Sequence, residues 1–139
     1  MHGNLFIRTS SNTDLRSFAA AVFSLLNVAN ASTRESENYA HGEYVTSQVL
    51  GLTVKVAIAD DSEFPDYQFW LNFKPTDAWV EESSSLDGLA DVVAKRLALE
   101  GYEVARALAF GKIGGAKILY TRKSAEGNVR DRLDIRWVG

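Results

Sequence analysis

Leu52-Thr53-Val54-Lys55-Val56-Ala57-Ile58-Ala59 is the stretch that decides the fold of this chain, together with Tyr67-Gln68-Phe69-Trp70-Leu71-Asn72-Phe73. Apolar residues alternate with polar or small ones in both segments, which predicts two β-strands. The connecting segment, Asp60-Asp61-Ser62-Glu63-Phe64-Pro65-Asp66, is acidic and contains a proline, and we therefore expect a loop.

The alternation assigns a face to each side chain of the two strands. In the first strand the apolar face carries Leu52, Val54, Val56 and Ile58. In the second it carries Tyr67, Phe69, Leu71 and Phe73, and we expect Tyr67 to be a core residue. Trp70 then lies on the opposite, polar face, beside a carboxylate-rich loop, and this position is typical of a surface that meets a partner.

Working towards the N-terminus, the sequence predicts a strand over 43–50, a polar loop over 31–42, a helix from Leu15 and a first strand over 4–8. The helix has apolar residues at the i, i+3, i+4, i+7 spacing of a face that lies on a sheet: Leu15, Phe18, Ala19, Val22, Phe23 and Leu26. Residues 10–13 offer several N-caps, and Asp14 suits the positive end of the helix.

Towards the C-terminus, the apolar residues Leu86, Leu89, Ala90, Val93 and Leu97 predict a second helix, capped by a serine of 83–85 and ended by Gly101. Strands over 102–110, 117–122 and 130–138 follow, joined by glycine-containing turns. The order β-α-β-β-β-α-β-β-β predicts one α+β domain over residues 1–139. We expect a mostly antiparallel sheet with both helices on one face, and a ferredoxin-like core with extra strands.

Composition limits the classes to consider. The chain has 139 residues, 46% of them hydrophobic, and no cysteine, which excludes disulfides and thiolate metal sites. Residues 1–18 lack the basic and apolar segments of a signal peptide, and no apolar stretch is long enough for a bilayer. We therefore expect a cytoplasmic protein that does not enter a membrane.

Charge is unevenly distributed along the chain. Residues 35–91 contain twelve acids and only two bases, a net charge of −10, whereas residues 95–139 have a net charge of +5. The acidic middle is either an ordinary solvated surface or a site for an electropositive partner. It would repel the phosphates of nucleic acid.

No catalytic constellation is evident. The only histidines are His2 and His41, and neither has an evident serine or acid partner. The carboxylates of 60–66 match neither a tuned acid–base pair nor the spacing of a calcium loop, and Gly111-Lys112-Ile113-Gly114-Gly115 is expected to be a hairpin turn rather than a phosphate loop. Acids are interspersed among the late basic residues, which indicates a charged hairpin. We expect no enzyme activity, no metal or other cofactor, and no nucleic-acid partner.

One family resemblance rests on the middle of the chain. The run Glu37-Asn38-Tyr39-Ala40-His41-Gly42-Glu43-Tyr44 is followed by Gly51-Leu52, Ala59-Asp60-Asp61, Phe64, Asp66-Tyr67 and Phe69-Trp70. This pattern, over roughly residues 5–120, resembles small bacterial immunity proteins that accompany polymorphic toxins, including those of contact-dependent growth inhibition. The resemblance implies a cytoplasmic protein that binds and neutralises a cognate C-terminal toxin domain, commonly a nuclease, and it implies no catalytic residue.

The residues themselves fit such a partner, because an acidic surface can occupy the basic cleft of a nuclease. The predicted toxin-binding residues are acids and aromatic anchors: Glu35, Glu37, Tyr39, Glu43, Tyr44, Asp60, Asp61, Glu63, Asp66, Trp70 and Trp79. Two alternatives remain open at this stage. One is a small-ligand-binding or regulatory α+β domain, and the other is a metal-assisted hydrolase using the 60–66 carboxylates.

Overall fold

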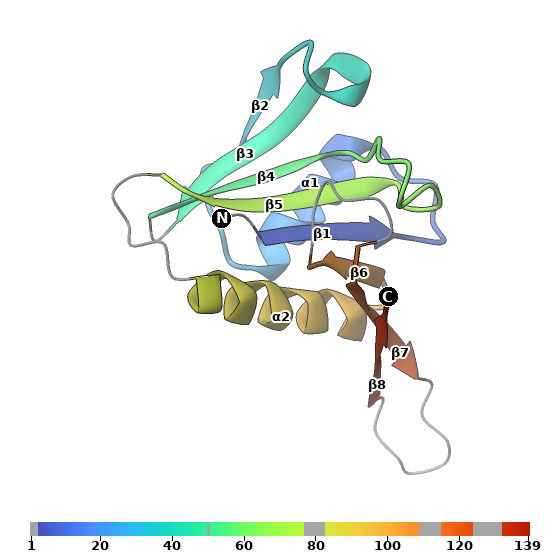
Figure 1. Cartoon of the computed structure of the whole chain (residues 1–139). Coiled ribbons are helices and arrows are strands. Elements are labelled where there is room, and N and C mark those ends of the chain that lie inside the picture. Colours follow the sequence, from blue (N-terminus) through green and yellow to red (C-terminus); the bar gives the residue numbers. More distant parts are fainter. Residues whose placement is uncertain (1–2, 50, 77–82, 109–114, 124–131) are drawn as a thin grey trace.

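A computed structural model describes residues 3–49, 51–76, 83–108, 115–123 and 132–139, which form an eight-stranded sheet with two α-helices (Figure 1). All neighbouring strands are antiparallel, in the order β2-β3-β4-β5-β1-β6-β7-β8. The predicted α+β class is therefore confirmed. The elements are β1 (Gly3–Arg8), α1 (Leu15–Leu25), β2 (Ser32–Glu35), the 3₁₀ turn η1 (Ala40–Gly42), β3 (Glu43–Val49), β4 (Leu52–Ile58), β5 (Phe69–Pro75), α2 (Ser83–Leu99), β6 (Glu103–Ala107), β7 (Lys117–Lys123) and β8 (Arg132–Val138).

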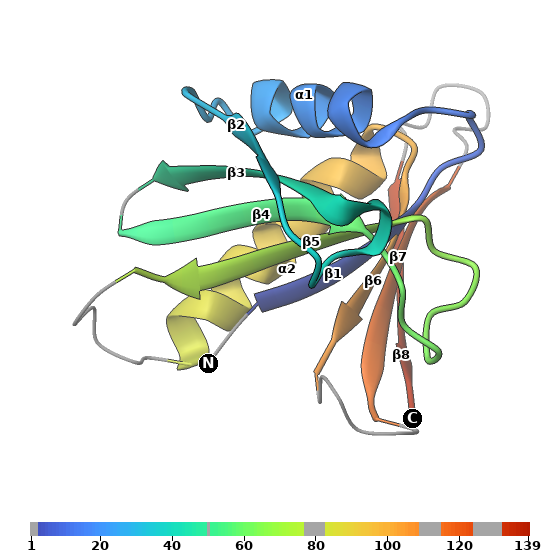
Figure 2. The same ribbon diagram turned by 90° about the horizontal axis from the view of Figure 1, so that it is seen from above.

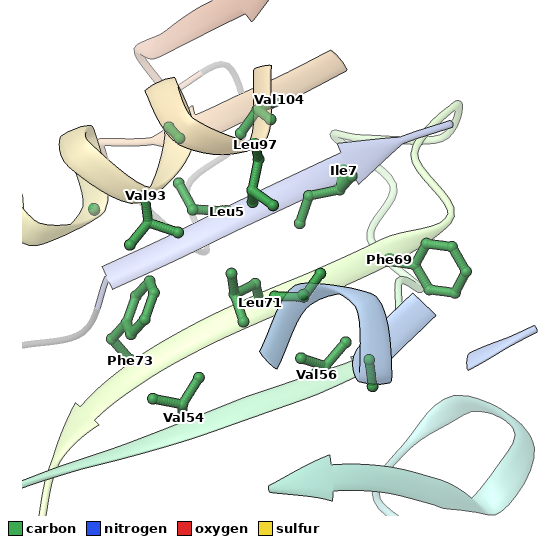
Figure 3. Packing of buried hydrophobic residues seen from close by; sticks show 14 of the residues in the cluster. Leu5, Ile7, Val54, Val56, Phe69, Leu71, Phe73, Val93, Leu97 and Val104 are labelled. Atoms are coloured by element: carbon green, nitrogen blue, oxygen red, sulfur yellow. The ribbon is translucent and has the colours of Figure 1, made fainter. Parts of the chain in front are cut away.

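Both helices pack against one face of the sheet. Helix α1 lies along β3 and β4, and α2 lies along β1, β6 and β7 (Figures 1 and 2). Their apolar sides share one buried cluster with alternate residues of the central strands, among them Leu5, Val56 and Leu71 (Figure 3). The apolar residues that recur every 3.6 residues in the helices and every second residue in the strands thus pack together in a single core.

The opposite, helix-free face carries the other half of each strand's alternation. Strand register places Tyr44 opposite Ala57, Ala57 opposite Trp70, and Trp70 opposite Phe6. The same row continues through Ala105 to Leu119. Since residues directly opposite each other share a face, Trp70 lies on the helix-free face, as its position in the alternation predicts.

Two expectations about the strands are wrong. Residues 32–35, expected in a loop, form the exposed edge strand β2, because their backbone pairs with the start of β3. Tyr67 is not part of the helix-side core. Its backbone N–H closes a turn onto the carbonyl of Phe64, β5 begins only at Phe69, and the Tyr67 ring packs with Phe6 and Phe64 on the other face. The turn that contains Pro65 and Asp66 extends to Tyr67, so the strand alternation begins only after this residue.

The ends of the helices follow the sequence closely. Asp14 is itself the N-cap of α1, and its carboxylate accepts a hydrogen bond of 2.7 Å from the Ser17 N–H. That bond lowers the pKa of Asp14 below its ordinary value. Gly101 has φ +100° just beyond α2, as predicted for a left-handed C-cap. The predicted serine cap of α2 lies outside the described side chains. No helix in the described ranges is both long and apolar enough to cross a bilayer.

Candidate binding site on the helix-free face

An aromatic cluster lies at one end of the helix-free face. Trp70 of β5 and Tyr44 of β3 belong to the same cross-strand row, and Tyr39 reaches them from the β2–β3 connection. The Tyr39 ring stacks on Tyr44 with centroids 4.5 Å apart, and on Trp70 with centroids 6.2 Å apart. Stacked rings of this kind present a large and rigid contact surface.

Buried amides fix the edge of the Trp70 indole. The indole Nε1–H donates to Asn4 Oδ1 over 3.0 Å, and Asn72 Nδ2 donates to the same oxygen over 2.9 Å. Asn4 and Asn72 are 3% and 5% exposed, so this hydrogen-bonded group is shielded from water. The Trp70 ring is therefore held in one orientation before any ligand arrives.

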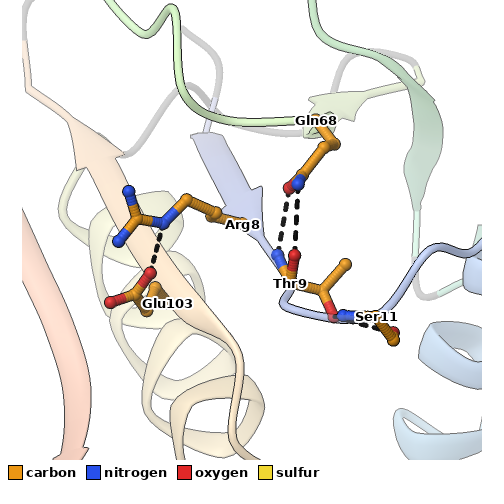
Figure 4. A network of polar contacts seen from close by, with 5 residues as sticks. All are labelled: Arg8, Thr9, Ser11, Gln68 and Glu103. Atoms are coloured by element: carbon orange, nitrogen blue, oxygen red, sulfur yellow. Dashed lines mark hydrogen bonds and ion pairs between the residues drawn. The ribbon is translucent and has the colours of Figure 1, made fainter.

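The β4–β5 connection, residues 59–68, is tied to the same face. Phe64 is buried and stacks on Phe6 with centroids 4.0 Å apart. The Gln68 side chain accepts from the Thr9 N–H and donates to the Thr9 carbonyl, while Arg8 pairs with Glu103 beside it (Figure 4). The hydrogen bond from Arg8 to Glu103 raises the pKa of the Arg8 guanidinium. These contacts set the position of the acidic loop.

The aromatic cluster and the acidic loop enclose a hollow of about 170 Å³. The β2–β3 and β4–β5 connections lie at the same end of the sheet (Figure 2), and both contribute residues that line this hollow. Within the described part of the chain, the carboxylate of Asp60 has no hydrogen-bond or ion-pair partner, whereas Asp61 Oδ1 accepts from the Glu63 N–H over 2.8 Å. The residues that line this hollow are Phe6, Asn38, Tyr39, Ala40, Ile58, Asp60, Asp61 and Trp70.

A second, more open hollow of about 390 Å³ lies at the β2–β3 connection. Half of its lining residues are acidic, and the lining consists of Glu35, Ser36, Glu37, His41, Gly42 and Glu43. Glu43 shares its strand parity with the core residue Val45, so Glu43 and the opposite Glu35 point to the helix-covered side. Glu35 lies directly opposite Glu43 in the sheet, and such a pair of like charges is unfavourable without a cation. Arg16 of α1 supplies one cation, at 3.1 Å from Glu43.

The structure thus separates the predicted site residues into groups. Tyr39, Asp60, Asp61 and Trp70 line the first hollow, with Tyr44 stacked beside it, and three glutamates line the second. Glu63 and Asp66 lie on the loop and line neither hollow. The charge of Asp66 is close enough to contribute a little to the raised pKa of Arg8. Trp79 falls outside the described residues.

Sequence reasoning missed Phe6, Asn38 and Lys55. In β1 the side chains of Leu5 and Ile7 alternate with that of Phe6, so the strand pattern indicates that Phe6 lies on the helix-free face. Its contact with this site could not be predicted, because its cross-strand neighbour Trp70 is far away in sequence. Lys55 Nζ lies 5.4 Å from the Tyr44 ring centroid and donates to the Tyr39 hydroxyl over 3.3 Å. It supports the outer side of Tyr39 and does not line the hollow.

A second group of charged and aromatic side chains lies under α2. Arg106 is only 9% exposed; its Nε donates to the Tyr120 hydroxyl over 3.1 Å, and its Nη1 donates to the Asp87 carbonyl. The Tyr120 hydroxyl donates in turn to Asp91 Oδ1 over 2.8 Å. Burial, with the bond to Asp91, raises the pKa of Tyr120 to about 12. Burial opposes ionisation of Asp91, but hydrogen bonds from Lys95 and Tyr120 outweigh it and lower the pKa of Asp91.

In the part of the chain that the structure describes, no three histidine, cysteine, aspartate or glutamate side chains gather in a way that would hold an ion. In the aromatic hollow the carboxylates of Asp60 and Asp61 lie beside Tyr39 and Trp70, an arrangement suited to binding a cation.

Comparison with known protein families, curated proteins and solved structures finds no match to this chain.

Proposed function

We propose that this protein is a non-catalytic immunity protein that binds and neutralises a cognate toxin domain through its helix-free face. The observation that carries the proposal is the hollow in which fixed aromatic side chains meet the carboxylates of Asp60 and Asp61. Interfaces obtain most of their binding energy from such buried aromatic anchors, and charge complementarity speeds association. A cytoplasmic location belongs to the same proposal, because the toxin acts on the cell that carries it.

The chemistry of the partner follows from charge. Five carboxylates line the two hollows at this end of the sheet. Asp60 and Asp61 border the aromatic hollow, and Glu35, Glu37 and Glu43 border the second, where Glu43 already pairs with Arg16 of α1. A toxin domain that binds phosphates, such as a nuclease, needs a basic cleft. An acidic surface that fills this cleft excludes the nucleic acid and requires no catalytic residue of its own.

The size and lining of the hollows favour a protein partner over a metabolite. The aromatic hollow, at about 170 Å³, is smaller than the roughly 300–1,000 Å³ of sites for small organic ligands. The second hollow is larger, but the described residues that line it include no apolar side chain. Ligand sites of that size are mostly apolar, so a metabolite would gain little from it.

We also propose a ferredoxin-like core for the sheet. The four central strands have the order β4-β5-β1-β6, with α1 following β1 and α2 following β5. This arrangement supports the split β-α-β pattern, in which each helix crosses over to a strand that is not the neighbour of the one it leaves. Strands β2, β3, β7 and β8 would then be additions at the two edges.

The experiment that tests the function is affinity purification of the tagged protein from its native bacterium. We expect an equimolar complex with the C-terminal domain of a large secreted protein encoded next to it, and loss of that domain's toxicity when the two are co-expressed. Recovery of the folded protein alone, with unreduced toxicity of the neighbouring domain, would contradict the proposal.

A matched pair of variants makes the test specific. Asp60→Lys with Asp61→Lys reverses two charges at the hollow, and Glu100→Lys with Asp134→Lys reverses two charges elsewhere on the surface. Only the first pair is expected to reduce recovery of the toxin domain. Equal recovery with both pairs would contradict an interface at the hollow. Reduced recovery with the second pair alone would move the interface to the basic C-terminal hairpin, which carries Asp134.

A further inference from the structure

We infer that the aromatic hollow receives a single arginine side chain of the toxin domain, with its guanidinium between the aromatic rings and the two aspartates. The inference rests on the proposed function for the source of the arginine. It adds the chemical group that the site recognises, and that group can be tested without the toxin.

The described residues that line the hollow supply no positive charge to balance its two carboxylates. Two carboxylates border it, no basic residue is among its lining residues, and Asp60 has no partner within the described ranges. Lys55, the basic residue in contact with Tyr39, is bonded to the Tyr39 hydroxyl and is not part of the lining. Lys117 Nζ lies 5.2 Å from the Phe64 ring centroid on the same loop, and it too is not among the lining residues. A cation from outside would therefore find Asp60 available for a direct ion pair.

The rings that line the hollow favour a planar cation. Tyr39 and Trp70 stand with their rings 28° from parallel, and Phe6 lines the same space. A planar guanidinium can stack on such rings while its N–H groups donate to a carboxylate in pairs. A lysine ammonium is compact and strongly hydrated, and it gains less from both contacts.

The size of the hollow and the fixed positions of its side chains also favour a single arginine side chain. A hollow of about 170 Å³ suits one side-chain head group and is small for a whole metabolite. Trp70 is fixed through Asn4, and Asp61 is fixed by the Glu63 N–H, so neither group has to be ordered when the guanidinium binds.

The test is an NMR titration of the full chain with arginine amide, followed at the indole N–H of Trp70. The Trp70→Phe variant identifies that signal among the three tryptophans. The matched probes are citrulline amide, whose side chain is the same length but neutral, and lysine amide, whose side chain is charged but not planar, and all three compounds have the α-amino group acetylated. We expect saturable binding of arginine amide in the millimolar range, weaker binding of lysine amide, and no Trp70 shift with citrulline amide.

The variant arm uses Asp60→Asn with Asp61→Asn, which removes both charges and keeps the shapes. We expect at least tenfold weaker binding of arginine amide, while the Glu100→Gln with Asp134→Asn control binds as the wild type does. Equal shifts with arginine and citrulline amides, equal or tighter binding of lysine amide, or unchanged binding in the Asp60/Asp61 variant would overturn the inference.

The outcomes separate this inference from the proposed function. If the toxin domain is captured but arginine amide does not bind at Trp70, the immunity function stands and the arginine site is wrong. If arginine amide binds with the expected selectivity but no toxin domain is captured, the site stands and the proposed function fails.

Discussion

The helix-covered and helix-free faces of the sheet each bring aromatic rings and carboxylates together, but they differ in how the carboxylates are paired. Under α2, the chain's own Arg106 contacts the Tyr120 hydroxyl and lies close to Asp87. At the hollow, Asp60 and Asp61 lie beside Tyr39 and Trp70. Lys55 contacts the Tyr39 and Tyr44 rings, but no basic side chain is among the described residues that line the hollow.

The difference teaches how to distinguish a structural network from a recognition site. Burying a charged or polar group without a partner is costly, so a network inside the core must be complete in the isolated chain. A surface hollow is under no such constraint, because water solvates its charges until a partner displaces it. We therefore expect changes under α2 to affect folding and changes at the hollow to affect binding.

The largest effect is expected from Arg106→Ala. The change removes a donor to Tyr120 and leaves buried polar groups without their partner, which should lower the free energy of unfolding by about 2–3 kcal/mol. Urea denaturation measures this, with the exposed Lys123→Ala on β7 as a control expected to cost less than about 1 kcal/mol. Affinity for the toxin domain should remain unchanged below the unfolding transition. A reduced affinity with normal stability would remove the distinction between the faces.

Tyr39→Ala should act mainly on binding. Tyr39 stacks on Trp70 and Tyr44 at the hollow, and truncation of a central aromatic anchor typically costs about 2 kcal/mol of binding free energy, or roughly thirtyfold in affinity. Calorimetric titration with the toxin domain measures the loss. A variant that loses stability but binds the toxin domain normally would show that Tyr39 is a packing residue only.

Asp91→Asn should change how stability depends on acid. The folded pKa of Asp91 is lowered, so the ionised carboxylate contributes stability above its unfolded value of 3.8, and this contribution is lost as the pH falls through the folded pKa. We expect the variant to be roughly 1 kcal/mol less stable at neutral pH, with the difference shrinking below pH 3.8. Thermal unfolding from pH 7 to pH 2 checks this. A constant difference over that range would contradict it.

Trp137→Ala should have the smallest effect. Trp137 is 70% exposed on the edge strand β8, far along the sheet from the hollow, so stability and toxin affinity should both change by less than about 0.5 kcal/mol. It is the aromatic control for Tyr39. A large loss of affinity in this variant would move the interface to the C-terminal hairpin.

Local periodicity was enough to predict much of this architecture. Alternation in 52–59 and 67–73 placed Trp70 on the correct face, and helical spacing identified the buried sides of α1 and α2. Edge strand β2 was missed because its four exposed residues, Ser32–Glu35, contain no apolar alternation, and only pairing with β3 orders them.

The composition of the hollow was only partly accessible from sequence. The acidic loop and Trp70 are evident as a local pattern, but the contact of Phe6 with Phe64 depends on β1 lying between β5 and β6. That order comes from long-range pairing, which no local pattern encodes. Tyr67 was assigned to the wrong face because a strand pattern does not show where the strand begins.

The most direct test of the account is the rate at which the protein associates with its toxin domain, measured by stopped flow over a range of salt concentrations. For the wild type we expect fast association that slows steeply as salt increases, because the acidic hollow attracts a basic cleft. Asp60→Lys with Asp61→Lys should associate at least tenfold more slowly at low salt and with a weaker salt dependence. Identical rates and salt dependence for wild type and variant would contradict the claim that the toxin binds at this hollow.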